Sequence, residues 1–227
     1  MPIKAIVFDI DNTLIDFYHF KEKCMDAALN AMIKAGLKVD RKKAEKIVWD
    51  IHKKYGMEYA YILQEFLMRI MKKIDYRILA HGIIAYRKER TNVLVPYPSV
   101  KKTIQILKRK YKIAVISDAP KQKAWLRLAL MDIDNLFDVV ITFEDTKKKK
   151  PHKLPFQIAA KRLQTKPEEI LMVGDSIHKD MEGAKRLGMK TCLALYGRTL
   201  IPKKNLPSVD FMIKKIDELL KVVKGII

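Results

Sequence analysis

The feature that most constrains the fold is a short apolar run that ends in two aspartates. The run Ile3–Phe8 is followed directly by Asp9-Ile10-Asp11. Its last three residues are uninterrupted by charge, which is typical of a strand buried on both faces of a parallel sheet. Side chains two residues apart in an extended chain point to the same side, so Asp9 and Asp11 are expected to lie together. Active sites of open α/β sheets lie at this carboxyl edge, and the pair is predicted to be catalytic.

The aspartate pair alone is ambiguous, because Asp and Asn also open ordinary surface turns. Three later apolar runs share its arrangement, since each leads into polar groups. These are Lys112–Ile116 before Ser117-Asp118, Val139–Phe143 before a lysine run that closes at Lys150-Pro151, and Ile170–Val173 before Gly174-Asp175, with Asp180 five residues further on. Strand ends in a parallel sheet meet at one edge, so these groups are expected to gather there.

Apolar runs alternate with helical patterns along most of the chain. Such alternation predicts an α/β fold, a doubly wound parallel sheet with right-handed crossovers. The helical segments expected after the first strand are Ser99–Lys110, Lys121–Met131, Pro155–Leu163, His178–Leu187 and Lys215–Val223, and a fifth strand is expected at Thr191–Leu195. The two tryptophans, Trp49 and Trp125, are expected in hydrophobic cores rather than at a cofactor.

The stretch between the first two strands has helical periodicity throughout. It is expected to form four helices, His19–Ala35, Arg41–Tyr55, Glu58–Ile74 and Tyr76–Arg90, with Gly36 and Gly56 as stop signals. We therefore predict two domains: residues 1–16 with 93–227 form the α/β core, and residues 17–92 form an inserted helical domain.

Composition allows this organisation. The 227 residues are 49% hydrophobic, enough for a full core, and no apolar stretch approaches membrane-spanning length. The N-terminus enters the first strand without a secretory pattern, which predicts a cytoplasmic protein. The net charge is +20, but the lysines are spread over nearly every helical segment and no nucleic-acid motif is present. We therefore expect no nucleic-acid partner, and the lysine-rich composition favours a thermophilic source.

The four polar strand ends resemble the motifs of the haloacid dehalogenase superfamily, in order and along nearly the whole chain. An Asp-x-Asp-x-Thr motif matches Asp9, Asp11 and Thr13, and three further motifs match Ser117, Lys150 and the Gly174-Asp175 segment with Asp180. The resemblance implies a Rossmann-like core with a class I helical cap. It also implies hydrolysis of a small-molecule phosphate ester.

Residue chemistry gives each motif a role in such a hydrolysis. Asp9 is predicted to be the nucleophile, because a covalent aspartyl-phosphate divides a slow reaction into two easier steps. A cation must then offset the repulsion between carboxylate and phosphate. Mg²⁺ prefers hard oxygen ligands, and Asp9, the main-chain carbonyl of Asp11 and Asp175 are its predicted ligands. The Asp11 side chain is left to protonate the leaving alcohol and then to activate water.

Asp11 also discriminates among relatives within the superfamily. The dehalogenases that gave it its name lack an aspartate at this position, since a halide needs no proton to depart. A phosphatase is therefore favoured over a dehalogenase.

Three further residues are expected to bind substrate. Ser117 would donate its hydroxyl to a phosphate oxygen, and Lys150 would spread the charge of the five-coordinate phosphorus, with Lys149 as the alternative. Asp118 stands where relatives often carry Asn, and its carboxylate is expected to face either solvent or the far end of the substrate. Asp180 is expected to orient metal-bound water or Lys150.

Two other functions stay open at this point. A phosphosugar mutase of the same fold would use Asp9 and Asp11 identically but return the phosphoryl group to another hydroxyl. A basic, non-catalytic nucleic-acid-binding module is the other, although the presence of both aspartates argues against it.

Overall fold

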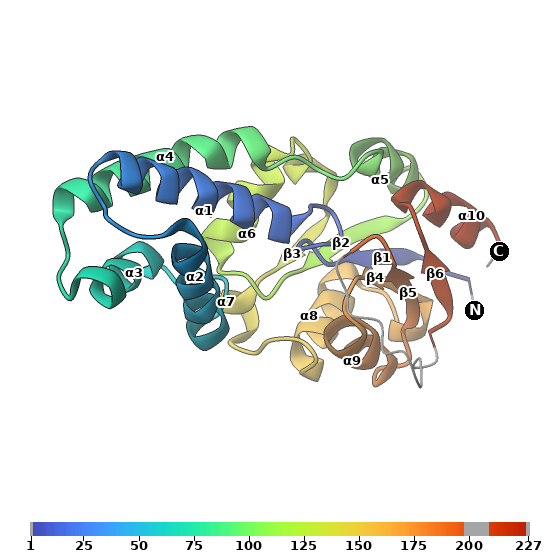
Figure 1. Cartoon of the computed structure of the whole chain (residues 1–227). Coiled ribbons are helices and arrows are strands. Elements are labelled where there is room, and N and C mark those ends of the chain that lie inside the picture. The colour runs from blue at the N-terminus through green and yellow to red at the C-terminus, as the bar shows by residue number, and fades with distance from the viewer. Residues whose placement is uncertain (1, 198–208, 226–227) are drawn as a thin grey trace. The chain divides into compact units, whose positions relative to one another are not determined.

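Two structural units make up the chain, and a computed structural model describes residues 2–197 and 209–225 (Figure 1). The first unit comprises Met1–Tyr18 and Leu94–Ile227, and we call it the α/β unit. The second comprises His19–Val93, and we call it the helical unit. Within the described residues no helix has the length and apolarity needed to cross a membrane.

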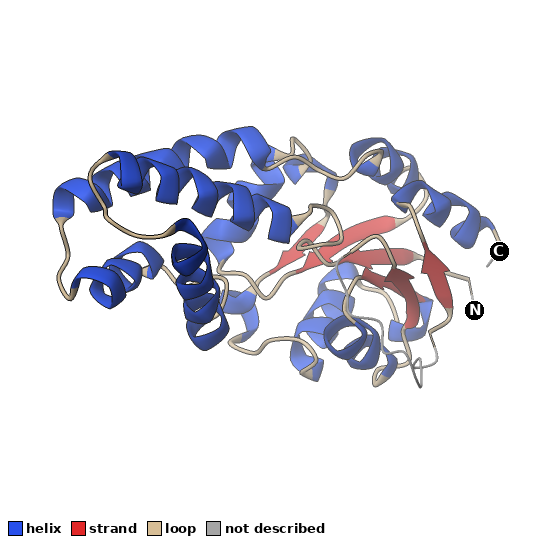
Figure 2. Cartoon of the chain, viewed as in Figure 1, coloured by secondary structure: helices blue, strands red, loops and turns tan. Residues whose placement is uncertain are grey.

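A six-stranded sheet organises the α/β unit (Figure 2). The strands are β1 (Ala5–Phe8), β2 (Lys112–Ile116), β3 (Val139–Ile141), β4 (Ile170–Gly174), β5 (Lys190–Ala194) and β6 (Phe211–Ile213). Their order is β3-β2-β1-β4-β5-β6, and every neighbouring pair is parallel. The order reverses beside β1, because the chain first adds strands on one side and then on the other. This confirms the predicted doubly wound parallel sheet.

Helices cover both faces of this sheet. They are α5 (Val100–Lys108), α6 (Lys121–Leu130), α7 (Phe143–Thr146), α8 (Lys153–Leu163), α9 (Glu182–Lys185) and α10 (Leu219–Lys224). Helix α8 packs on β2 and β3 and helix α9 on β5, while α5 packs on β2 and against α10.

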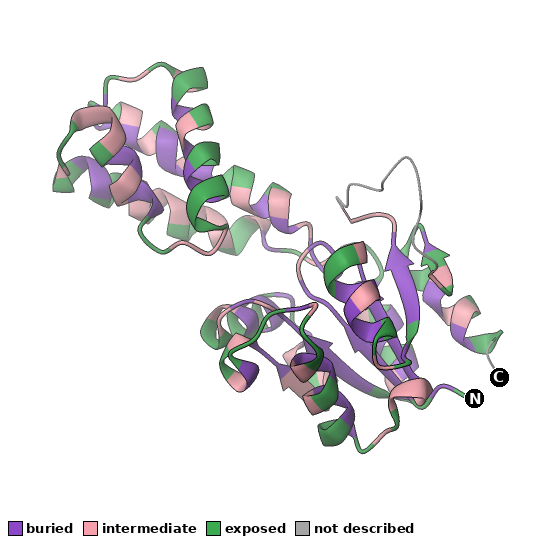
Figure 3. Cartoon of the chain, turned by 90° about the horizontal axis from the view of Figure 1, so that it is seen from below, coloured by how far each residue is buried: buried purple, intermediate pink, exposed green. Residues whose placement is uncertain are grey.

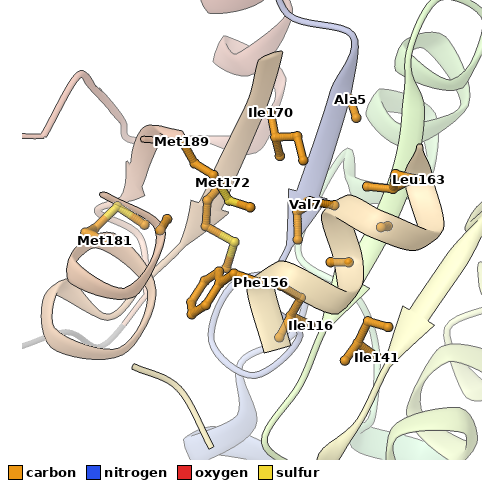
Figure 4. Packing of buried hydrophobic residues seen from close by; sticks show 14 of the residues in the cluster. Ala5, Val7, Ile116, Ile141, Phe156, Leu163, Ile170, Met172, Met181 and Met189 are labelled. Carbon is orange, nitrogen blue, oxygen red and sulfur yellow. The ribbon is translucent and has the colours of Figure 1, made fainter. Parts of the chain in front are cut away.

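Alternate strand residues point to each face, and both sets are buried (Figure 3). On the α8 side, Val7 and Met172 pack with Phe156 in one hydrophobic cluster (Figure 4). The intervening Ile6 and Phe8 have no exposed surface either. Burial on both faces explains why the first strand is a continuous apolar run rather than an alternating one.

Several expected boundaries are wrong. The strand expected over Val139–Phe143 ends at Ile141, because Thr142 and Asp145 form a capping box that starts α7. The helix expected over His178–Leu187 consists of a π-helical turn, Ile177–Met181, followed by α9. Strand β6 was not predicted. Trp49 and Trp125, expected in cores, are 44% and 41% exposed.

The helical unit contains most of α1 (Phe17–Lys34), together with α2 (Arg41–Tyr55), α3 (Ile62–Met71) and α4 (Tyr76–Val93). The sequence shows why α2 has these limits: the Asp40 side chain accepts a hydrogen bond from Lys43 N at its start, and Gly56 follows its end with φ 86°. Apolar residues of all four helices, such as Leu29, Ile51, Phe66 and Leu79, form a separate hydrophobic core.

Candidate active site

Asp9 extends the β1–β4 pairing by one residue. Its main-chain N–H donates to the Val173 carbonyl at 2.9 Å, and its side chain is buried. The hydroxyl of Thr13 lies 3.4 Å from Asp9 Oδ2 and donates to it. Backbone pairing and this hydroxyl together fix the Asp9 carboxylate at the carboxyl edge of the central strand.

The chain turns sharply after Asp9, and Asn12 makes the turn. Asn12 has a left-handed backbone with φ 63°, a conformation that asparagine tolerates better than most residues. Its side-chain oxygen accepts hydrogen bonds from the main-chain N–H groups of Phe17 and Tyr18, at 3.1 and 3.3 Å. Asn12 therefore ties the aspartate loop to the start of α1, a role that sequence reasoning did not assign.

Lys150 lies in the loop between α7 and α8, and its side chain extends to the Asp9 carboxylate. Its Nζ lies 2.5 Å from Asp9 Oδ1, 2.6 Å from Asp180 Oδ1 and 3.1 Å from the Ile116 carbonyl oxygen. Lys149, the alternative considered from the sequence, is exposed and places its Nζ 5.7 Å from the centre of the Phe143 ring. The two neighbouring lysines thus occupy different environments, and only Lys150 lies against Asp9.

Asp175 and Asp180 come from the segment that follows β4. One oxygen of each, together with one of Asp9, lies within 4.8 Å of the other two. Asp180 Oδ2 accepts a hydrogen bond from Ser176 N at 3.0 Å. A side chain at Gly174 would place its Cβ 2.4 Å from this oxygen, so the close approach of Asp180 to the backbone requires glycine there.

The buried cluster carries more negative than positive charge. It contains three carboxylates, Asp9, Asp175 and Asp180, and the ammonium group of Lys150. Burial raises the pKa of Asp9 well above its ordinary value; Lys150 opposes this rise, and Asp180 adds to it. Burial alone would lower the pKa of Lys150, but Asp180 and Asp9 raise it above its usual value. An excess of buried carboxylate favours a further cation at this position.

Ser117 and Asp118 follow β2 at the same edge. Ser117 is buried, and its Oγ accepts a hydrogen bond from Ala119 N at 3.2 Å. Asp118 Oδ1 accepts from the main-chain N–H of Lys150 at 2.9 Å, and its Oδ2 lies 3.6 Å from Lys179 Nζ. Asp118 therefore holds the backbone of the lysine loop, and the expectation that its carboxylate faces solvent or the far end of a substrate stays a prediction.

Asp11 is not one of the three clustered carboxylates, but its charge is near enough to contribute to the raised pKa of Asp9. Its side chain is 25% exposed, and Oδ2 accepts a hydrogen bond from Arg127 NH1 at 3.0 Å. Arg127 belongs to α6 and is buried. The two aspartates of the first motif thus have different cationic partners, Lys150 for Asp9 and Arg127 for Asp11.

The segment after β5 supports the site from another side. The Tyr196 hydroxyl donates to the Thr13 carbonyl at 3.0 Å. A Cβ added at Gly197 would lie 2.4 Å from Asp175 Cβ and 2.6 Å from the Asn12 carbonyl oxygen. Gly197 therefore permits close packing between the aspartate loop and Asp175.

The structure brings Asp9, Lys150, Asp175 and Asp180 together and places Ser117 and Asp118 at the same edge, while the chemical role of each remains a prediction. Sequence reasoning missed Asn12, Arg127 and Gly197. A signal for Arg127 existed, because it lies three residues after Ala124 and directly before Leu128, both fully buried. A charge on the apolar face of a helix indicates a buried partner.

Comparison with known proteins identifies the family. The model of the haloacid dehalogenase-like hydrolases matches residues 3–188. A glyceraldehyde 3-phosphate phosphatase of Methanocaldococcus jannaschii is 36% identical, covering 99% of this chain and 98% of the relative. One from Pyrococcus furiosus is 32% identical, covering 98% and 93%. The solved structure of a HAD phosphatase from Thermococcus onnurineus has a TM-score of 0.71 at 26% identity, covering 98% and 99%.

The chain belongs to the haloacid dehalogenase-like hydrolase family. Within that family it is an enzyme of the phosphatase branch, a phosphoric monoester hydrolase. The resemblance inferred from the four strand-end motifs is thereby confirmed.

Proposed function

We propose that this phosphatase hydrolyses small phosphate monoesters with Mg²⁺, through an aspartyl-phosphate intermediate on Asp9. The observation that carries the proposal is the buried cluster at the end of β1, in which Lys150 lies between Asp9 and Asp180. The Asp9 carboxylate can attack phosphorus, and Lys150 reduces its repulsion of an anionic substrate. The same ammonium group can stabilise the additional charge that develops on the phosphoryl oxygens.

The donor set fits a divalent magnesium ion. The cluster has three carboxyl groups for one ammonium group, and carboxylate oxygens are the ligands that Mg²⁺ prefers. Asp9, Asp175 and the main-chain carbonyl of Asp11 would hold the ion, while Asp180 would continue to hold Lys150. When bound, Mg²⁺ would neutralise phosphate charge and orient the ester. A simple test follows: exhaustive chelation should abolish turnover, and added Mg²⁺ should restore it.

Asp11 is the group proposed to move the proton. It is two residues from the nucleophile and more exposed than Asp9, so it can exchange a proton with a leaving alcohol and later with water. Ser117 is proposed to contribute a hydroxyl hydrogen bond to a phosphate oxygen.

Glyceraldehyde 3-phosphate is the first substrate to test, because the two relatives described above are named glyceraldehyde 3-phosphate phosphatase. Pyrophosphate is a second, since a pyrophosphatase PpaX of Bacillus thuringiensis is 29% identical over 98% of this chain. The net charge of +20 favours encounter with any small anion and does not discriminate between these two.

The decisive experiment measures release of inorganic phosphate from a panel of sugar phosphates, triose phosphates and pyrophosphate with Mg²⁺. Stoichiometric release of phosphate supports a phosphatase, whereas an isomeric phosphate ester without free phosphate would identify a mutase. Asp9→Asn should abolish both turnover and covalent phosphoryl labelling. Asp217→Asn, the same change at an exposed position, should leave both intact. Labelling that persists in Asp9→Asn would refute the nucleophile.

We further propose that the helical unit sets substrate preference. His19 and Lys21 of this unit, and Tyr18 directly before it, are the first positions to vary, by substitution with alanine. The ratio of kcat/KM between two phosphate esters should change more than the hydrolysis of p-nitrophenyl phosphate. An unchanged ranking of substrates across these variants would place specificity in the loops of the α/β unit.

The cytoplasmic location, the thermophilic source and the absence of a nucleic-acid partner remain predictions. The last is checked by a gel-shift titration with DNA at increasing salt, in which no salt-sensitive complex is expected.

A further inference from the structure

Arg127 is a buried cation that the proposed chemistry does not yet use. It lies on α6, between residues that pack into the core, and its side chain is only 5% exposed. Its NH1 donates to Asp11 Oδ2 at 3.0 Å. A guanidinium withdrawn from water in this way is costly unless a carboxylate compensates it. Asp11 supplies that carboxylate from a different element, far away in the sequence.

The guanidinium is also held by an aromatic ring. Its central carbon lies 4.4 Å from the centre of the Phe17 ring, within the range of a cation–π contact. Phe17 is buried, and its main-chain N–H is bound by the Asn12 side chain. The aspartate loop therefore contacts Arg127 through a carboxylate and through the residue that begins α1, so both the position and the plane of the guanidinium are restricted.

We propose that Arg127 is the positioning residue for Asp11, and that it holds the carboxyl group in place for proton transfer to the leaving alcohol. The inference rests on the proposed role of Asp11 as the general acid. Arginine keeps its proton throughout the functional pH range, so it can hold Oδ2 before and after Asp11 transfers a proton. Moving Asp11 away would leave a buried guanidinium without this carboxylate, which opposes displacement of the aspartate during the reaction.

A positioning role has a specific kinetic signature. An alkyl phosphate needs a proton on its leaving oxygen, whereas p-nitrophenolate departs without one. The value of kcat/KM reports the steps up to departure of the first product, so it isolates this proton transfer from the later hydrolysis of the intermediate. An arginine that only stabilises the fold would affect both substrates alike. One that positions the acid would affect the alkyl ester selectively.

The experiment compares kcat/KM for the best alkyl ester of the substrate panel and for p-nitrophenyl phosphate. Arg127→Met should lower the value for the alkyl ester by about 100-fold, the effect of a misplaced catalytic group. For p-nitrophenyl phosphate, kcat/KM should fall by less than about 10-fold. Arg127→Lys keeps the positive charge but lacks the planar guanidinium. Its kcat/KM for the alkyl ester should lie between those of Arg127→Met and the wild type. Phe17→Leu removes the ring only and should shift the ratio of the two values least.

Two controls make the outcome unambiguous. Asp11→Asn sets the full effect of losing the acid, about 100-fold or more for the alkyl ester. Leu128→Ala creates a cavity beside Arg127 on the same helix and should lower the melting temperature. It should leave unchanged the ratio of kcat/KM for the alkyl ester to kcat/KM for p-nitrophenyl phosphate. If Asp11→Asn changes the ratio and the Arg127 variants do not, the positioning role is overturned. If Asp11→Asn leaves the ratio unchanged, the general acid of the proposed function is wrong, and the inference fails with it.

Discussion

The two units of this protein treat buried polar groups differently. Among the described residues, the helical unit buries a single polar side chain, His52, within an otherwise apolar core. The described residues of the α/β unit bury two cations and three aspartates, together with six serine or threonine hydroxyl groups and one amide. Most of these charges lie at the carboxyl edge of the sheet, next to β1 and β4.

The contrast between the two units concerns the free-energy cost of buried charges. Burying charges costs free energy that apolar packing would not, so a cluster such as that around Lys150 stabilises a fold poorly compared with leucine or valine. The cluster supports the proposal that this edge of the sheet is the site of the reaction. The helical unit shows the opposite arrangement, with aliphatic and aromatic side chains doing nearly all of its interior packing. The following predictions test this contrast, from the largest expected effect to the smallest.

Lys150→Met should have the greatest effect, because it leaves Asp9 and Asp180 buried without their cation. We expect kcat to fall by about 1000-fold, through loss of charge stabilisation on the phosphoryl group. The free energy of unfolding should fall by about 3–5 kcal/mol, as for other broken buried ion pairs. Steady-state kinetics and urea denaturation check the two values. Lys149→Met is the matched control, and a similar loss of activity in it would contradict the assignment.

Gly197→Ala tests how closely the site is packed. The added methyl group would meet Asp175 Cβ at 2.4 Å and the Asn12 carbonyl at 2.6 Å, so one of them must move. We expect activity to fall by about 10- to 100-fold, together with a higher Mg²⁺ concentration for half-maximal rate. Gly225→Ala is the control: a Cβ at this position lies 3.7 Å from its nearest neighbours. Its activity should match that of the wild type. Equal Mg²⁺ dependence in all three proteins would show that Asp175 has not moved.

Addition of Mg²⁺ should stabilise one unit selectively. A ligand that binds only the folded state raises stability by about 2.7 kcal/mol at 100 times its dissociation constant. Hydrogen exchange followed by mass spectrometry should show greater protection in peptides that contain the ends of β1 and β4. Peptides of α2 and α3 should change least. Asp175→Asn should remove the protection, and protection gained uniformly along the chain would contradict a metal site confined to the α/β unit.

Substitution of His52 by leucine should have the smallest effect on stability. Neither of its ring nitrogens hydrogen-bonds to another described residue, and the side chain lines a cavity of about 130 Å³ with Lys21, Met25 and Trp49. Replacement by leucine therefore loses little, and the unfolding free energy at pH 8 should change by less than about 1 kcal/mol.

The same substitution should alter the response to acid. Burial lowers the pKa of His52 below its usual 6.5, and Lys21 acts in the same direction. The unfolded chain then binds a proton more readily, so this contribution to stability is complete above pH 6.5 and is lost as the pH falls towards the folded pKa. His52→Leu should show a shallower decline in melting temperature between pH 7 and pH 5. His81→Leu, at an exposed site of the same unit, should decline like the wild type. An identical decline in the His52 variant would refute the shifted pKa.

Much of the fold followed from local patterns. The predicted and observed ranges agree for β2 and for α2, because continuous apolar runs and a capped helical period are signals contained within a few residues. Strand β6 was not predicted. Phe211–Ile213 has only three residues, and its pairing with β5 is a long-range contact that no local sequence pattern encodes. Helix α3 is shorter than its periodicity suggested, ending where Lys72 adopts a left-handed backbone with φ 59°.

The sequence by itself determined the class of the enzyme and the residues most suited to its chemistry. Strand ends of a parallel sheet meet at one edge, so Asp9, Ser117, Asp175 and one lysine of the run that ends at Lys150 were expected together. Tertiary structure alone decided which groups hold them. Lys150 rather than Lys149 lies against Asp9, Asp118 binds the lysine loop, and Arg127 binds Asp11. These choices depend on side-chain directions and on packing between distant elements, and a difference of one residue or one rotamer changes the partner.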